Sequence, residues 1–441
     1  MAGRLISRRS FLHAGASALA AGAVAGCARD EPLPPGHVRL NFYTYGTPPE
    51  FVYLFQQQLV PAFEKLHPTI HVRVNYSLGD AGYDAKLLTL IAGRMAPDLI
   101  HVTQQNFPFY AARNVLMPLD DLLARDSELS ASDFFPQVID GMRFGGQQLG
   151  LPSGFSAICM LYNQDLFERF RIPFPHADWN RDEFLDTCRG LTRDLDNDGH
   201  IDLFGTVNPS AYNRWPAWVW MNGGEIMTPD LSRCVMDSPE AIEGLEFYVD
   251  LSKRHNVAPT PGQAMGQDGQ DLFASQLIGM IADSRYAYKR FIRRRALPFG
   301  WDVAPMPRHK TRATTFIWGG NCILRTTKYP AEAWEFLKFM SGPIGAEINI
   351  KAGNALPAYA QAAIDEVANP IDPQTPPNDH YFLDAVQYGR TAPNPPQYAE
   401  YVQAMTHLAD AYIEGRAGIS VEEASRRFAR EVNGFLEAGV F

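Results

Sequence analysis

The chain has 441 residues and a formal net charge of −10, and 46% of its residues are hydrophobic. This composition supports a large core, but single cores stop growing at roughly 250–300 residues, so we expect two lobes or more. The excess of acidic residues argues against nucleic acid as a partner. Beyond the first 26 residues, charge, proline or glycine interrupts every apolar run well before the roughly twenty residues of a transmembrane helix.

The first 26 residues have the pattern of an export signal. Arg8 and Arg9 precede an Ala/Gly-rich run from Ala14 to Ala25 that is too short and too weakly apolar to span a bilayer. We therefore expect a twin-arginine signal peptide over residues 1–26, which is absent from the mature protein. Cleavage of the signal removes its three arginines, so the mature chain has 36 basic and 49 acidic residues and a net charge of −13.

The small residues before Cys27 resemble a bacterial lipoprotein box, which implies that Cys27 carries a lipid. Residues 27–36 then form a stiff, proline-rich linker between this anchor and a folded part that begins near His37. We expect the protein at the outer face of the cytoplasmic membrane or in the periplasm. The alternative is a soluble protein whose basic first residues have no such role.

Four further cysteines show no metal-ligand spacing such as C-x-x-C: Cys159, Cys188, Cys234 and Cys322. Each lies in an apolar or amphipathic stretch. A buried free thiol and one disulfide in an exported protein are therefore both open.

Hydrophobic periodicity predicts alternating strands and helices at the start of the folded part. Apolar residues alternate in three segments and recur at helical spacing in the two segments between them. In chain order these elements are strand His37–Thr44, helix Glu50–His67, strand Ile70–Tyr76, helix Tyr83–Ala92 and strand Asp98–Thr103. This order predicts a parallel sheet covered by helices.

The same pattern returns later in the chain. The predicted elements there are strand Ser156–Asn163 and helices Asp165–Phe170, Trp179–Thr192, Ala331–Met340 and Ile419–Leu436. An α/β protein with two lobes is the simplest interpretation of both regions.

Short motifs recur along almost the whole mature length. They are Ala96–Ile100, Asn114–Leu122, Leu149–Pro152, Leu161–Phe167, Trp179–Phe184, Met221–Gly224, Gly279–Ala282, Trp318–Asn321 and Ala333–Met340. In this order and spacing they resemble the sugar-binding extracellular solute-binding proteins of ABC transporters, the family that includes maltose-binding protein. Asn114 stands where Gly is usual, and Asn also tolerates left-handed turns.

The resemblance implies a type II periplasmic-binding-protein fold, in which two mostly parallel, helix-flanked sheets are joined by strands that cross between the lobes. Lobe one would take residues 37–153 and 318–364, and lobe two residues 154–317 and 365–441. A hinge motion would close the lobes around a ligand, and the glycines of Ser153-Gly154 and Gly319-Gly320 could absorb it. No cofactor is required, and we expect a monomer that docks on an ABC permease.

A sugar site needs aromatic faces for stacking and polar groups for the hydroxyls. By resemblance, Tyr286 stands where the family often has a stacking Trp, and Gln105 and Asn106 match positions that bond sugar hydroxyls. The full set of predicted ligand-binding residues is Tyr45, Gln105, Asn106, Ser156, Tyr212, Trp215, Asp283, Arg285, Tyr286, Trp318, Gly319 and Tyr398.

The resemblance thus implies a protein that captures a mono- or oligosaccharide in the cleft and delivers it to the permease. A receptor of the same fold for glycerol phosphate or another polyol derivative is the alternative, and it would need cations such as Arg214 and Arg285 in the cleft. A secreted carbohydrate-active enzyme has less support, since the chain has no G-x-S-x-G, P-loop or H-E-x-x-H motif.

One acidic segment copies the first half of a calcium loop, with Asp194, Asp196, Asp198 and Asp202 at the ligand spacing. Position twelve is Gly205 rather than the bidentate Glu of an EF-hand. A structural calcium ion and a turn stabilised by Asp side chains are both open.

Overall fold

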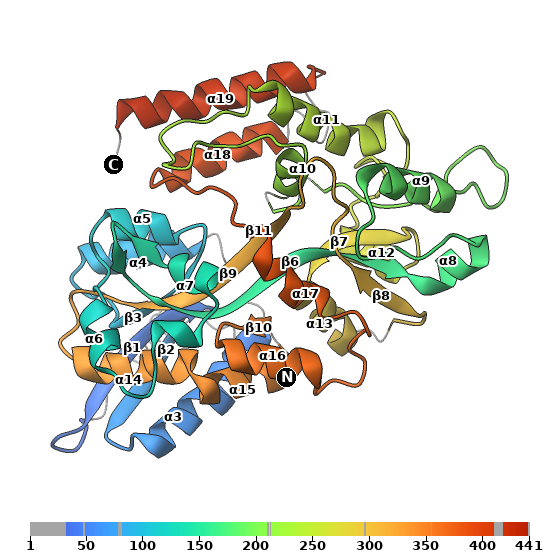
Figure 1. Ribbon diagram of the computed structural model, residues 1–441. Coiled ribbons are helices and arrows are strands. Elements are labelled where there is room, and N and C mark those ends of the chain that lie inside the picture. The colour runs from blue at the N-terminus through green and yellow to red at the C-terminus, as the bar shows by residue number, and fades with distance from the viewer. Residues whose placement is uncertain are drawn as a thin grey trace, which may run out of the picture.

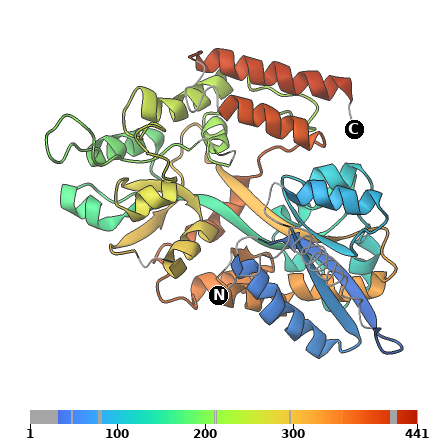
Figure 2. The same ribbon diagram turned by 180° about the vertical axis from the view of Figure 1, so that it is seen from behind.

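The computed structural model describes residues 32–46, 49–77, 82–209, 211, 213–294, 297–353, 355–409 and 418–439. These residues form two lobes that lie side by side and are joined by long strands (Figures 1 and 2). The predicted signal peptide, the predicted lipidation site Cys27 and the predicted ligand-binding Tyr212 lie outside the described residues.

Lobe one is built on three parallel strands from the start of the chain. β1 (Val38–Tyr45) lies between β2 (Ile70–Ser77) and β3 (Leu99–Thr103). Its register against β2 runs from Val38 opposite Ile70 to Tyr45 opposite Ser77. The three strands therefore end at the same edge of the sheet.

The helices of lobe one cover this sheet. The first is a continuous helical run of α2 (Pro49–Leu54), the π-helical η1 (Phe55–Leu59) and α3 (Val60–Leu66). It ends there because Pro68 disfavours the helical conformation at His67, whose φ and ψ are −125° and 70°. The other helices and short strands are α4 (Tyr83–Ala92), α5 (Phe107–Ala112), α6 (Asp120–Arg125), η3 (Ala131–Asp133), α7 (Pro136–Asp140), β4 (Arg143–Phe144), β5 (Gln147–Gln148), α14 (Pro330–Ser341), α15 (Pro343–Lys351) and α16 (Ala360–Ala368).

Two long strands, β6 (Leu151–Asn163) and β9 (Thr314–Ile323), connect the lobes. The first half of β6 pairs with β9 and with β10 (Leu356–Pro357). Its second half pairs with β7 (Met280–Ser284) and β8 (Trp301–Ala304) of lobe two. The register of β6 against β9 shifts between Pro152 and Gly154, which places a bulge where the two strands cross between the lobes.

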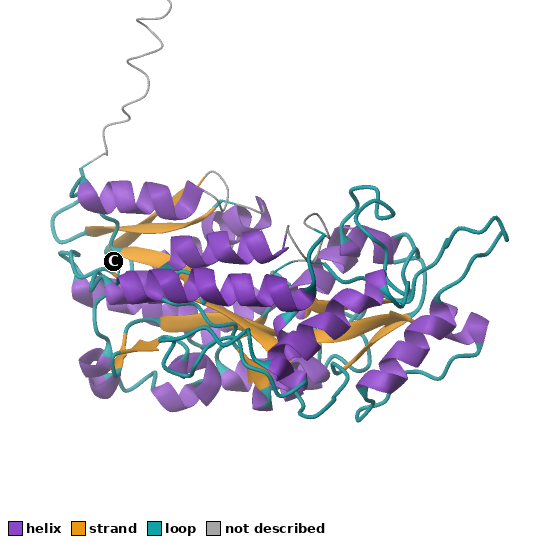
Figure 3. Ribbon diagram, turned by 90° about the horizontal axis from the view of Figure 1, so that it is seen from above, coloured by secondary structure: helices purple, strands orange, loops and turns teal. Residues whose placement is uncertain are grey.

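Lobe two packs helices on both faces of its strands (Figure 3). Its elements besides β7 and β8 are α8 (Gln164–Phe170), α9 (Arg181–Leu191), α10 (Pro216–Met221), α11 (Pro239–Lys253), α12 (Gly269–Ala274), α13 (Arg285–Arg294), α17 (Tyr381–Asp384), η4 (Ala385–Gln387), β11 (Gly389–Arg390), α18 (Tyr398–Leu408) and α19 (Val421–Ala438). The C-terminal α18 packs on α19, which also packs on α11, as Figure 1 shows.

Two hydrophobic cores stabilise these layers. The first fills lobe one and continues along β6 to Phe273 of α12 and Tyr288 of α13. The second lies on the other face of lobe two, between α9, α10, α11 and α19, and contains Trp179 and Trp215. Because the first core extends through both lobes, the lobes share a continuous apolar contact behind the crossing strands.

The predicted two-lobed α/β fold is confirmed, and each predicted strand and helix is present with small shifts at its ends, except that β6 begins at Leu151, five residues before the predicted strand Ser156–Asn163. One detail differs: among the described strands, parallel pairs join β1 to β2, β1 to β3 and β9 to β11, whereas every pair of β6 is antiparallel. The strand that leaves lobe one and the strand that returns run in opposite directions, so neither lobe has a purely parallel sheet. The predicted lobe boundary at Ile364 falls inside α16.

The described cysteines, Cys159, Cys188, Cys234 and Cys322, are all buried free thiols. Of the two interpretations of these residues, the structure thus supports the free thiol. Among the described helices, none is both long and apolar enough to cross a membrane.

Candidate functional site

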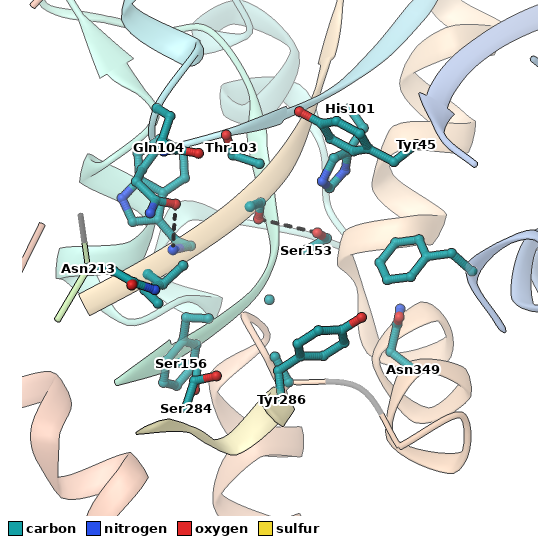
Figure 4. Close-up of a pocket in the computed structure, with 18 of the residues that line it drawn as sticks. Tyr45, His101, Thr103, Gln104, Ser153, Ser156, Asn213, Ser284, Tyr286 and Asn349 are labelled. Carbon is teal, nitrogen blue, oxygen red and sulfur yellow. Dashed lines mark hydrogen bonds between the residues drawn. The ribbon is translucent and has the colours of Figure 1, made fainter. Parts of the chain in front are cut away.

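A cavity of about 730 Å³ opens between the lobes where β6 and β9 cross (Figure 4). Residues of both lobes and of both crossing strands line it. Seven of the predicted ligand-binding residues are among them: Tyr45, Gln105, Ser156, Tyr286, Trp318, Gly319 and Tyr398. That they contact a ligand stays a prediction.

Lobe one contributes the carboxyl ends of its parallel strands. Tyr45 is the last residue of β1, and Thr103 ends β3 just before Gln104 and Gln105. Ligands of open α/β sheets bind at this edge of the strands. Two hydrogen bonds, each of 3.2 Å, join Gln104 to the backbone of Trp318. The backbone N–H of Gln104 donates to the Trp318 carbonyl, and the backbone N–H of Trp318 donates to the side-chain oxygen of Gln104. These bonds extend the β3–β9 pairing to the wall of the cavity.

Tyr45 is held by an aromatic stack. Its ring lies 4.2 Å from that of Tyr83, which stacks in turn on Tyr43 at 4.8 Å. Tyr43 and Tyr45 point to the same face of β1 because side chains alternate along a strand. The stack fixes the Tyr45 ring at the cavity, where a pyranose could lie against it.

Trp318 is more constrained. Only 4% of it is exposed, and its indole packs edge-on against Phe107 with ring centroids 5.8 Å apart. A Cβ atom at Gly141 would lie 2.8 Å from the indole nitrogen, so this position requires glycine. Trp318 therefore presents only a small part of its ring to the cavity.

Tyr286 and Tyr398 come from lobe two, at the starts of α13 and α18. Figure 4 shows the Tyr286 ring projecting into the cavity from below, with Asn349 beside it and Tyr45 across the space. Burial, and to a smaller extent Asp84, raises the pKa of Tyr398 to about 12. Its hydroxyl therefore remains protonated at neutral pH and can donate a hydrogen bond.

Asp84, in the first turn of α4, is the only carboxylate among the described lining residues. The Tyr110 hydroxyl and the Asn106 amide both donate to its Oδ1, at 2.6 and 3.0 Å. No described residue donates to Oδ2. Asp84 is thus oriented by neutral groups and keeps one oxygen for a hydroxyl of a ligand.

His101 lies beside Tyr45 and bonds Asn321 through Nδ1 at 3.1 Å. Burial lowers the pKa of His101 to about 4, although the Asn321 bond partly opposes this. The imidazole is therefore neutral at physiological pH. With Nδ1 donating to the Asn321 oxygen, Nε2 is an acceptor for a hydroxyl.

We expect acid to destabilise the protein through His101. Its native pKa of about 4 lies below the ordinary 6.5, so the unfolded chain binds the proton first as the pH falls. The free energy of unfolding should therefore drop between about pH 6.5 and about pH 4 by more in the wild type than in His101→Asn. Urea unfolding at about pH 7 and about pH 4.5 measures this difference, and equal losses in both proteins would contradict it.

Two of the predicted ligand-binding residues that carry charge, Asp283 and Arg285, do not line the cavity, and that they contact a ligand stays a prediction. Asp283 is fully buried and accepts from Arg214 at 2.6 Å and from Gln270 at 2.9 Å. Arg285 is 1% exposed, and its guanidinium points away from the cavity to Glu366 and Asp379. Asp283 is predicted at the site because it lies a turn before Tyr286, and Arg285 because a phosphorylated ligand would need a cation. Their neighbours Ser284 and Tyr286 do line the cavity.

Trp215 and Asn106 also do not line the cavity, and that they contact a ligand stays a prediction. Trp215 is 1% exposed in the second core, because α10 is buried on every side. Asn106 lies behind the cavity wall, where its side chain accepts from the Thr103 amide and donates to Asp84 and Tyr45. Asn106 therefore orients two lining residues and does not line the cavity itself.

Sequence reasoning missed several polar lining residues: Asp84, His101, Thr103, Gln104, Ser153, Asn213, Ser284 and Asn349. Two signals were available for some of them. Thr103 and Gln104 end a parallel strand, and Asp84 begins the helix that follows β2, so all three belong to the sheet edge that binds ligands. Asn213 and Asn349 carry no such local signal.

The acidic segment forms a tight loop. Asp194 accepts from the amides of Asn197 and Gly199, and Asp202 accepts from that of Leu195. Carboxylate oxygens of Asp194, Asp196 and Asp202 lie within 4.8 Å of one another, whereas Asp198 is not part of this group. These hydrogen bonds account for the loop as an Asp-stabilised turn, and calcium binding stays a prediction.

A two-lobed α/β fold with a polar, aromatic cavity at the crossing of its lobes defines a protein that binds a small solute between them. Residues 47–347 match the model of the bacterial extracellular solute-binding proteins, and the chain belongs to this family.

Solved structures share the fold of this chain, and a curated protein is similar in part of its sequence. An ABC substrate-binding protein of Listeria monocytogenes, solved in complex with cycloalternan, is 26% identical, with a TM-score of 0.79 over 91% of this chain and 99% of that one. The sugar-binding protein MalE of Xanthomonas citri has the same fold, at 19% identity and a TM-score of 0.77 over 91% and 98% of the chains. An uncharacterized lipoprotein of Streptomyces antibioticus is 28% identical over 171 residues, 38% of this chain and 37% of that one.

Proposed function

We propose that this protein captures a neutral mono- or oligosaccharide in the cavity between its lobes and delivers it to an ABC permease, without chemistry of its own. The observation that carries this proposal is the cavity lining. Aromatic rings, hydroxyls and amides surround a single carboxylate, and none of the described lining residues is Lys or Arg. Rings stack on the C–H faces of sugars, and neutral donors and acceptors bond their hydroxyls.

The size of the cavity and the relatives support the same ligand class. A volume of about 730 Å³ lies in the roughly 300–1,000 Å³ range of small-molecule sites. The Listeria monocytogenes relative was solved with a cyclic sugar, cycloalternan. We propose further that the protein works as a monomer and is tethered through a lipid on Cys27. The similarity to a lipoprotein of Streptomyces antibioticus supports the lipid tether.

The cavity disfavours the two alternative functions. A glycerol phosphate receptor needs cations at its anion, yet the Arg214 and Arg285 side chains are paired with buried acids. A glycosidase needs a pair of carboxyl groups flanking the glycosidic bond, and the described lining residues include Asp84 alone.

Thermal unfolding with a panel of ligands tests the proposal. The panel contains glucose, maltose, maltotriose and cyclic glucans, with sorbitol, glycerol 3-phosphate and glucose 6-phosphate for comparison. We expect a saturable rise in Tm with one class of neutral sugar, because a ligand at a hundred times its Kd adds about 2.7 kcal/mol to the free energy of unfolding. A shift with phosphorylated compounds alone, or product formation from any sugar, would overturn it.

A further inference from the structure

A cluster of buried charges lies behind the cavity. The Arg285 guanidinium donates through Nε to both Asp379 oxygens, at 2.9 and 3.1 Å, and through Nη2 to Glu366 at 2.9 Å. The side chains of these three residues are only 1–3% exposed. The Tyr288 hydroxyl also donates to Asp379, and Lys289 lies 3.9 Å from Glu366. Isolated charges are costly to bury, so this pairing is needed to hold Arg285 in place.

Arg285 is joined to the cavity through its backbone. Its amide donates to the Ser156 hydroxyl at 2.9 Å, and Ser156 lies on the crossing strand β6 and lines the cavity. The residues on either side of it, Ser284 and Tyr286, line the cavity as well. Figure 4 shows Ser156, Ser284 and Tyr286 together on one wall. The guanidinium therefore anchors the segment that carries this wall.

The two acids come from different parts of the molecule. Glu366 lies on α16, which packs against α15 and β10 of lobe one and also contacts α17 of lobe two. Asp379 precedes α17 in a segment fixed to lobe two, because Asn378 bonds Asp302 of β8 through its amide and its side chain, at 3.1 and 2.8 Å. In Figure 1, α13, α16 and α17 lie next to one another beside the crossing strands.

We propose that Arg285 is a positioning residue, whose bond to Asp379 fixes it within lobe two and whose bond to Glu366 ties lobe two to lobe one at the hinge. The ionic tie sets the angle between the lobes and the place of the Ser284–Tyr286 wall relative to the lobe-one wall. An apolar contact would hold the same elements together without fixing their orientation, whereas a guanidinium fork does so through directed hydrogen bonds. Its effect on ligand binding rests on the proposed function, but the ionic tie between the lobes does not.

The test uses the full chain without ligand. Glu366→Gln removes the charge of the interlobe half with almost no change of shape, and Asp379→Asn does the same for the half within lobe two. Glu347→Gln is the matched control, because Glu347 on α15 pairs with Lys351 and both are well exposed. Hydrogen exchange of the Arg285 amide and the radius of gyration from small-angle X-ray scattering are measured for each variant.

We expect Glu366→Gln to speed exchange of the Arg285 amide roughly tenfold or more and to change the radius of gyration, because local opening follows the lost contact. Asp379→Asn should speed exchange but leave the radius of gyration as in the wild type, and Glu347→Gln should change neither. Glu366→Asp keeps the charge, so its exchange rate and radius of gyration should lie between those of Glu366→Gln and the wild type. This variant replaces Glu366→Gln in the test if Glu366→Gln does not fold.

Equal radii of gyration of Glu366→Gln and Asp379→Asn would overturn the proposal. A lower Tm of Glu366→Gln with an unchanged exchange rate and an unchanged radius of gyration would also overturn it. A merely structural role predicts that second result. No sugar is added in these measurements. A ligand panel in which no sugar raises the Tm would therefore contradict the proposed function and would not affect the proposal for Arg285.

Discussion

Trp215→Ala should lower the free energy of unfolding by about 3–5 kcal/mol, as large-to-small changes of buried Trp do. Trp215 is 1% exposed and lies in the second core, so its removal leaves a cavity that α10 and its neighbours cannot refill. The affinity of the folded variant for its sugar should be unchanged, because Trp215 does not line the interlobe cavity. Urea unfolding and a calorimetric titration measure the two quantities.

Tyr53→Ala is the control for this change. Tyr53 is 60% exposed on α2, so the loss of its ring should alter the free energy of unfolding by no more than about 0.5 kcal/mol. A Trp215→Ala protein of wild-type stability that no longer binds sugar would return Trp215 to the binding site and contradict the burial described above.

Elements that depend on local pattern could be predicted from the sequence. The helix that ends before Pro68 and the strand β1 follow from apolar spacing and from the backbone restriction that proline imposes on the residue before it. The first half of β6 could not, because Pro152 and Gly154 interrupt its apolar run. Its strand conformation is fixed by β9 and β10, which lie far away in the chain.

The same limit applies to the site. Tyr45 ends one parallel strand and Gln105 follows another, so their place at the sheet edge could be predicted from local pattern. The burial of Arg285 could not be predicted, because its partners, Glu366 and Asp379, come 81 and 94 residues later and nothing near Arg285 in the sequence indicates them. Burial of a charge depends on such distant partners, whereas strand ends are local.

Asp84→Asn should weaken binding of the sugar identified by the ligand panel by about 10- to 100-fold, because a hydrogen bond to a charged group contributes about 1.5–3 kcal/mol. The free Oδ2 of Asp84 is the strongest acceptor among the described lining residues, and an amide nitrogen in its place cannot accept. The fold should be retained, since the amide oxygen can still accept from Tyr110 and Asn106.

Asp121→Asn is the matched control, because Asp121 is exposed on α6 and does not line the cavity. Isothermal titration of the three proteins with the same sugar gives the comparison. Equal affinity of Asp84→Asn and wild type would mean that the sugar bonds only neutral groups of the cavity. An increased affinity for glycerol 3-phosphate in Asp84→Asn would show instead that the carboxylate excludes anions, since like charges repel across the cavity. We therefore expect Asp84, the single carboxylate among the described lining residues, to contribute both to hydroxyl binding and to rejection of phosphates.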